Sequence, residues 1–186
     1  ESANFSLEVS VLAVGNRCMC WGGVTAVGVV WTARRPEITR PGLRCGLVAP
    51  AEGSSHFAVM LGGSFGGFAG ATARRLAESG VCAFALGYFG ASGLPGELVD
   101  IPLESLEQGI EWFRENHAGT HPIGLVGFSK GAELALLLAA RMRGSIGPVV
   151  AIAPSHVVWF GLTAPGPRGD PRSSSSRWSV GGNAVP

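Results

Sequence analysis

Charged residues and cysteines are scarce in this chain, and their scarcity excludes several classes of protein. Only 15% of the 186 residues are charged and the formal net charge is +1, so no basic stripe is available to displace the counterions of a nucleic acid. The four cysteines (Cys18, Cys20, Cys45 and Cys82) are too few and too irregularly spaced for a disulfide scaffold or a zinc site. We therefore expect reduced structural thiols, with no bound metal, no cofactor and no nucleic acid partner.

Long apolar runs are missing as well. The most apolar early stretch, residues 18–31, contains three glycines and is not followed by a small-residue cleavage site, which is typical of a buried strand rather than of a signal peptide or a membrane span. The sequence ends Ala-Val-Pro, without a peroxisomal signal, so the cytoplasm is the expected location. The composition, with 46% apolar residues, suits one soluble globular domain.

Strand-like and helix-like segments alternate from residue 57 onward. Apolar runs predict strands at 57–61, 81–86, 123–126 and 149–153, and helical spacing predicts helices at 69–79, 103–116 and 132–142. This order predicts an α/β protein with a mostly parallel sheet and helices on both faces. Runs at 5–14 and 24–31 indicate further strands, whereas residues 165–176, rich in Pro, Gly, Arg and Ser, are typical of a surface loop or disordered tail.

The sequence G-F-S-K-G at 127–131 stands between a predicted strand and a predicted helix, which is the setting of a nucleophile elbow. In such a tight turn, side chains two positions either side of the serine would collide with the backbone, and Gly127 and Gly131 remove that collision. Ser129 would then project above the carboxyl end of the sheet, where the Lys130 amide can stabilise an oxyanion. A chance occurrence of the motif in a glycine-rich chain is the alternative.

A second glycine-rich segment, G-G-S-F-G-G at 62–67, follows the first predicted strand. In a parallel sheet this loop would lie beside the elbow, where the amide of Ser64 or Phe65 could supply the second oxyanion donor. A plain tight turn and a phosphate-binding loop are the alternatives. The phosphate loop is disfavoured because no Gly-Lys-Ser/Thr ending is present and no acidic residue directly follows the next strand.

A complete catalytic triad is not visible in the chain. In a hydrolase the acid and the histidine follow the nucleophile, yet the histidine after Ser129 is His156 and the acidic residues are Glu133 and Asp170. His156 comes too early for the base and is expected in a loop, and Glu133, one turn into the helix, is expected to support the elbow. The remaining histidines precede the nucleophile and are expected to be solvated: His56, His117 and His121.

Several of these motifs together resemble one family. The segments are LGGSFGG at 61–67, ALGYFG at 85–90, IPLE at 101–104, GLVGFSKGAELALLL at 124–138, SHVVW at 155–159 and SRW at 176–178. They are similar to the C-terminal catalytic α/β-hydrolase domain shared by the acyl-CoA thioesterases and bile acid-CoA:amino acid N-acyltransferase. By this resemblance residues 34–160 form the hydrolase core, 1–33 the remnant of an immunoglobulin-like N-terminal domain, and 161–186 a loop or disordered tail.

The resemblance implies an acyl-CoA substrate and Ser129 as the nucleophile of a Ser-Asp-His triad. A serine rather than the cysteine of the family's acyltransferases favours hydrolysis to free acid and CoA. The resemblance also implies that the Asp and His of the triad lie beyond residue 186. We therefore expect an incomplete sheet with an open edge that promotes association, and little activity of the isolated chain. The alternatives are a dienelactone-hydrolase-like carboxylesterase, a CoA-dependent N-acyltransferase, and an inactive fragment or interaction module.

Overall fold

The computed structural model describes residues 12–14, 17–19, 29–32, 44–50, 53–163 and 172–186. Most of the predicted strand at 5–14, together with Cys20 and Asp170, lies outside the described residues. The first described strands are β1 (Leu12–Val14) and β2 (Arg17–Met19), which form an antiparallel pair of their own.

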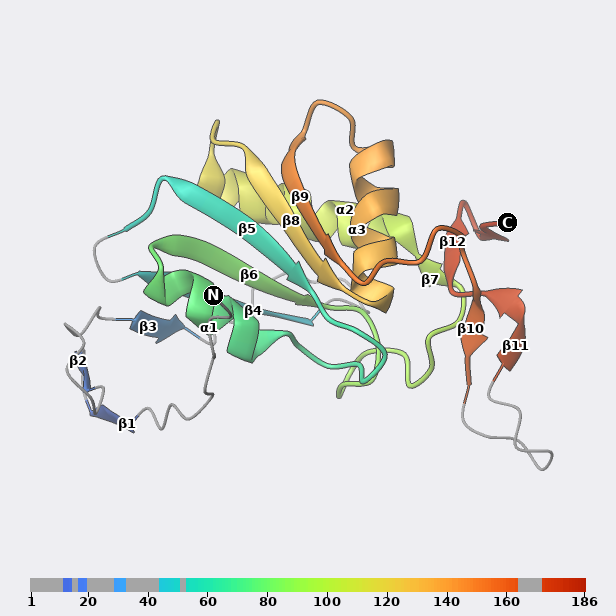
Figure 1. Ribbon diagram of the computed structural model, residues 1–186, viewed down its shortest axis with the longest axis horizontal. Coiled ribbons are helices and arrows are strands. Elements are labelled where there is room, and N and C mark those ends of the chain that lie inside the picture. The colour runs from blue at the N-terminus through green and yellow to red at the C-terminus, as the bar shows by residue number, and fades with distance from the viewer. Residues whose placement is uncertain (1–11, 15–16, 20–28, 33–43, 51–52, 164–171) are drawn as a thin grey trace, which may run out of the picture.

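A six-stranded sheet forms the centre of the fold, with the strand order β3-β4-β6-β5-β8-β9 (Figure 1). Its strands are β3 (Val29–Thr32), β4 (Arg44–Pro50), β5 (His56–Leu61), β6 (Val81–Gly87), β8 (Ile123–Phe128) and β9 (Ile146–Ile152). The four strands β6, β5, β8 and β9 are parallel, and β4 and β3 join one edge in antiparallel fashion. The prediction of a mostly parallel sheet is confirmed.

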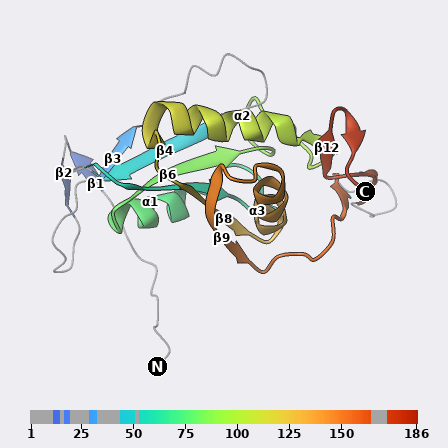
Figure 2. The ribbon, with the colours of Figure 1, turned by 90° about the horizontal axis from the view of Figure 1, so that it is seen from above.

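Helices cover both faces of this sheet, also as predicted. They are α1 (Gly70–Glu78), α2 (Leu103–Phe113) and α3 (Lys130–Arg141), and a π-helical turn (Arg114–Ala118) extends α2. Seen from above, α1 and α2 lie on opposite sides of the sheet (Figure 2). The helix predicted to run to residue 116 changes to π-type hydrogen bonding at residue 114 and ends at Gly119, which has a φ of 58°.

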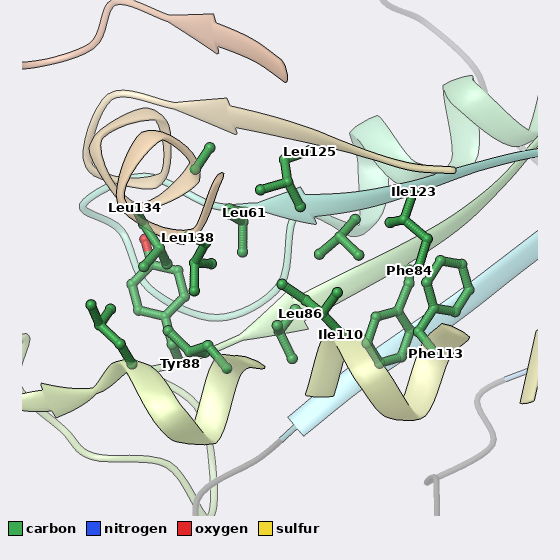
Figure 3. Close-up of a cluster of buried hydrophobic side chains, with 14 of the residues drawn as sticks. Leu61, Phe84, Leu86, Tyr88, Ile110, Phe113, Ile123, Leu125, Leu134 and Leu138 are labelled. Atoms are coloured by element: carbon green, nitrogen blue, oxygen red, sulfur yellow. The ribbon is translucent and has the colours of Figure 1, made fainter. Parts of the chain in front are cut away.

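The register of the strands divides the core into two layers. Side chains of alternate strand residues meet the apolar stripes of α2 and α3 on one face, where α2 contributes residues three or four apart in sequence. Figure 3 shows this cluster, which includes Leu61, Phe84, Leu86, Tyr88, Ile110, Phe113, Ile123, Leu125, Leu134 and Leu138. On the other face, the small residues Ala73 and Ala77 of α1 let that helix approach Val48 and Met60 closely.

The C-terminal segment differs from its prediction as a loop or disordered tail. The sequence predicts a loop or disordered tail over residues 161–186, but the described part of this stretch contains most of β10 (Phe160–Leu162), together with β11 (Arg172–Ser176), β12 (Trp178–Val180) and β13 (Asn183–Ala184). β12 pairs in parallel with the short strand β7 (Ile101–Pro102), so that Trp178 lies opposite Ile101. Burial of Arg177 and Trp178 holds β12 against the rest of the fold.

The strand β3 lies just before the predicted domain boundary at residues 33–34. β3, which lies in the stretch assigned to an N-terminal domain, pairs along its whole length with β4 and thus extends the central sheet. The immunoglobulin-like assignment of residues 1–33 stays a prediction. None of the helices in the described part of the chain combines the length and apolar character that crossing a bilayer requires.

Candidate active site

Ser129 lies alone in the turn between β8 and α3. Its backbone has φ 53° and ψ −110°, a region that non-glycine residues rarely occupy. The Ser129 N–H donates to the carbonyl of Ile152 at the end of β9 (2.8 Å), and the Ser129 carbonyl accepts hydrogen bonds from Ala132 (3.0 Å) and Glu133 (3.1 Å). The neighbouring strand and the helix therefore hold the strained turn from both sides.

The two glycines of the motif are required by close packing. A methyl group at Gly127 would lie 2.7 Å from the Cα of Ala132, and one at Gly131 would lie 2.6 Å from the carbonyl carbon of Leu61. Real side-chain carbons do not approach backbone atoms this closely. The structure therefore has the strand, turn and helix geometry that the sequence motif predicted.

The glycine-rich loop at 62–67 lies beside this turn. Its strand β5 pairs in parallel with β8, with Leu61 opposite Gly127. A methyl group at Gly63 would lie 3.7 Å from the Cβ of Ser129. Ser64 is exposed, and Phe65 is 98% exposed to solvent. Donation by the amides of Ser64, Phe65 and Lys130 to one oxyanion stays a prediction.

The end of β6 holds the loop in place. The Tyr88 hydroxyl donates to the Gly62 carbonyl (2.5 Å), and the Gly67 N–H donates to the Phe89 carbonyl (2.8 Å). Gly66, with a φ of 66°, approaches Gly90 so closely that a methyl group would lie 2.8 Å from the Gly90 Cα. Burial raises the pKa of Tyr88, and the nearby Glu133 charge raises it further, so the hydroxyl keeps its proton and remains a donor.

A buried polar cluster lies directly behind the turn. The Glu133 carboxylate accepts one hydrogen bond from Arg177 Nη1 (2.6 Å) and one from Trp178 Nε1 (2.8 Å). Glu133 and Arg177 are each 3% exposed and Trp178 is fully buried. This position of Glu133, in the first turn of α3, agrees with the prediction that it supports the elbow. Sequence reasoning noted Arg177 and Trp178 only as part of the SRW segment and missed their contact with Glu133, although a buried carboxylate in a largely apolar helix requires a polar partner.

Lys130 borders this cluster. Partial burial and the positive charge of Arg177 lower the pKa of the Lys130 ammonium, and Glu133 opposes them. Lys130 is the first residue of α3, so its amide has no acceptor within the helix.

The histidines lie at the surface. His156 is exposed in the segment after β9, and His56, His117 and His121 are exposed as predicted. His117 packs against the rings of Trp112 and Phe113. Within the described ranges, no group of three or more histidine, cysteine or acidic side chains is placed to hold a metal ion.

The chain has an α/β-hydrolase fold: a mostly parallel central sheet, helices on both of its faces, and a sharp turn at a serine between a strand and a helix. Among solved structures, the ferulic acid-bound Est1E from Butyrivibrio proteoclasticus has a similar fold, with a TM-score of 0.50 and 20% identity over 60% of this chain and 49% of that chain.

Residues 101–163 match the sequence model of the family described as "BAAT / Acyl-CoA thioester hydrolase C terminal". Over this segment the chain is similar to the C-terminal part of the acyl-CoA thioesterases and related acyltransferases. The chain is 32% identical over 136 residues to human acyl-coenzyme A thioesterase 6, covering 66% of this chain and 32% of the relative. It is 30% identical over 134 residues to rat acyl-coenzyme A amino acid N-acyltransferase 2, covering 68% and 32%. The chain thus spans about a third of the length of these relatives.

Proposed function

We propose that this chain carries the nucleophile and oxyanion part of an acyl-CoA thioesterase site, with Ser129 as the nucleophile. The observation that supports it most strongly is the strained turn of Ser129 between two glycines that packing requires, in a chain related to acyl-CoA thioesterases. The Ser129 oxygen would attack the thioester carbonyl carbon, and the carbonyl electrons would move to the oxygen held by the amides of Lys130 and of Ser64 or Phe65.

The remaining steps conserve atoms and charge. The tetrahedral intermediate collapses, the C–S bond breaks, and CoA leaves as the thiol after taking up the proton released by Ser129. Water then attacks the acyl-serine ester and releases the free acid. An oxyester at Ser129 is less prone to attack by an amine than a thioester is, which favours hydrolysis over N-acyl transfer. The proposal assigns no base among the described residues, so we expect slow turnover by this chain alone.

The test is covalent labelling of Ser129 by a fluorophosphonate probe, read by mass spectrometry of the intact chain and its peptides. Slow labelling of the wild type at Ser129, abolished in Ser129→Ala and unchanged in the matched control Ser145→Ala, would support the proposal. Labelling that persists in Ser129→Ala would contradict it. Rapid labelling that also needs His156, tested with His156→Ala, would show that the chain supplies its own base and that the expected slow turnover is wrong.

The same proteins offered acyl-CoA and p-nitrophenyl esters side by side distinguish the reaction classes. Release of CoA thiol that needs Ser129 supports thioester hydrolysis. Turnover of the p-nitrophenyl ester alone would favour the carboxylesterase alternative. Formation of an amide when an amino acid is added would favour the N-acyltransferase alternative.

A further inference from the structure

Trp178 contacts one residue beside each part of the candidate site. Its indole N–H donates to Glu133 Oε1 (2.8 Å), and Glu133 in turn donates its backbone N–H to the Ser129 carbonyl (3.1 Å). On its other side, the Trp178 ring lies 5.5 Å from the ring of Tyr88, centroid to centroid. Tyr88 holds the Gly62 carbonyl through its hydroxyl. The indole therefore connects Glu133, which bonds to the serine turn, with Tyr88, which bonds to the start of the glycine-rich loop.

The carboxylate of Glu133 has a fixed orientation because both of its oxygens are engaged. Arg177 Nη1 occupies Oε2 while Trp178 Nε1 occupies Oε1. The Arg177 Nε is buried without a hydrogen-bond partner among the described residues. A buried ion pair that leaves one donor unpaired is a poor source of stability. The main effect of the Glu133–Arg177 pair is therefore geometric, because it fixes the first turn of α3.

We propose that Trp178 is a positioning residue that sets the spacing between the serine turn and the glycine-rich loop. The proposal rests on the proposed function, because these two elements are the ones assigned to the nucleophile and to the oxyanion donors. Trp178 itself is fully buried and acts through Glu133 on one side and through Tyr88 on the other. A hydrogen bond to a charged acceptor and an aromatic contact are both sensitive to small displacements, so release of one side loosens the other.

The primary test is amide hydrogen exchange in Trp178→Phe, which keeps an aromatic ring but removes the indole N–H. The matched control is Trp112→Phe, since Trp112 packs against Phe84 and is not among the hydrogen-bonded residues Glu133, Arg177 and Trp178. We expect exchange about tenfold faster in Trp178→Phe over both 62–67 and 127–133, at wild-type rates over 44–50. The control should change neither site segment. Faster exchange in only one of the two segments, or equally throughout the chain, would overturn the proposal.

Two milder variants decide the question if Trp178→Phe does not fold. Tyr88→Phe removes only the hydroxyl that holds Gly62, so exchange should rise over 62–67 alone. Glu133→Gln weakens the acceptor of the indole without touching the loop. The proposal requires that Glu133→Gln also raise exchange over 62–67, and wild-type exchange there would overturn it.

Labelling of Ser129 separates this inference from the proposed function. Where the wild type is labelled at Ser129, Trp178→Phe should be labelled about tenfold more slowly than Trp112→Phe, and equal rates in the two folded variants would overturn the positioning role. Where the wild type is not labelled at all, the proposed function fails, and the exchange measurement still decides whether Trp178 joins the two segments.

Discussion

The two glycines that flank Ser129 are needed for a reason that differs from the usual one. Neither Gly127 nor Gly131 has a positive φ, whereas Gly66 and Gly90 do. Backbone conformation would therefore tolerate alanine at 127 and 131, and it is the contact between α3 and the ends of the central strands that forbids a side chain there. Ser129 itself carries the conformational strain of the turn.

A single methyl group at either glycine should consequently be costly. We expect Gly127→Ala and Gly131→Ala to lower the free energy of unfolding by about 3 kcal/mol, because backbone atoms must move to admit the methyl group. Gly70→Ala is the matched control, since no atom lies within 4 Å of the added carbon, and it should change stability by less than about 1 kcal/mol. Urea unfolding measures all three, and equal stability of Gly127→Ala and Gly70→Ala would refute the packing argument.

The thiols give a second prediction at this scale. Burial raises the pKa of Cys82 to about 11 and that of Cys45 to about 12. An unfolded thiol ionises near its ordinary pKa of 9.0, so the unfolded state loses protons first as pH rises. The stability contributed by each neutral thiol is therefore complete below about pH 9 and declines above it, by up to about 1.4 kcal/mol per pH unit and thiol.

Thermal unfolding as a function of pH checks this dependence. The midpoint should fall above about pH 9, and the fall should be shallower in Cys82→Ala even if that variant is less stable at neutral pH. The same slope in the wild type and in Cys82→Ala would show that other groups cause the decline.

At the scale of elements, the local pattern was sufficient for the parallel strands and their helices but not for the rest. The strands β5, β6 and β8 are short apolar runs and α2 has a clear helical stripe, so each is visible in its own sequence. β4 contains a glycine and begins with an arginine, and it was not predicted. A run of four serines was assigned to a tail, yet Ser175 donates to the Asp100 carboxylate (2.6 Å), 75 residues earlier.

One part of the candidate site could be predicted from the sequence and another part could not. The serine turn could be predicted because its geometry is encoded in five adjacent residues. The buried Arg177 and Trp178 could not, because their role depends on Glu133, 44 and 45 residues away in sequence. Periodicity carries no information about partners at that separation.

The Glu133–Arg177 pair supplies a prediction for these elements. Arg177→Met leaves the Glu133 carboxylate buried without its cation, and we expect the free energy of unfolding to fall by about 3–5 kcal/mol. Adding Glu133→Gln should recover part of that loss, because an amide carries no charge and can still accept the hydrogen bond from Trp178. Urea unfolding of the two single variants and the double variant forms a closed cycle, and strictly additive effects would show that the two side chains do not interact.

At the scale of the whole molecule, one face of the sheet is only partly covered in the described structure. α1 packs over β4 and β6, while Phe128 and Val126 of β8 lie beside Ile152 and Val150 of β9 on that same face. Phe128 is 55% exposed, Val150 49% and Ile152 48%. β9 is also the last strand of the described sheet, so its outer edge and this apolar surface adjoin.

An open edge next to an apolar surface promotes association between copies. We expect the chain to form concentration-dependent oligomers, as measured by sedimentation velocity. A charge on the exposed face should oppose this, so Val150→Lys should shift the distribution toward monomer. Leu136→Lys is the control, since Leu136 is 44% exposed on α3, away from that surface. A wild type that stays monomeric throughout, or an equal effect of both lysines, would count against the β9 surface.

The dependence of the serine turn on Trp178 also has a consequence for synthesis. A ribosome adds about 5–20 residues per second, so the 45 positions that separate Trp178 from Glu133 correspond to roughly 2–9 s of translation. During that interval the nascent chain already holds Ser129 and its helix, but the indole that fixes Glu133 has not been made. β12 must then reach back to pair with β7, 77 residues earlier than Trp178 at Ile101. Contacts between residues so far apart in sequence form late in folding, so Ser129 reaches its final geometry only after Trp178 has been made and β12 has paired with β7.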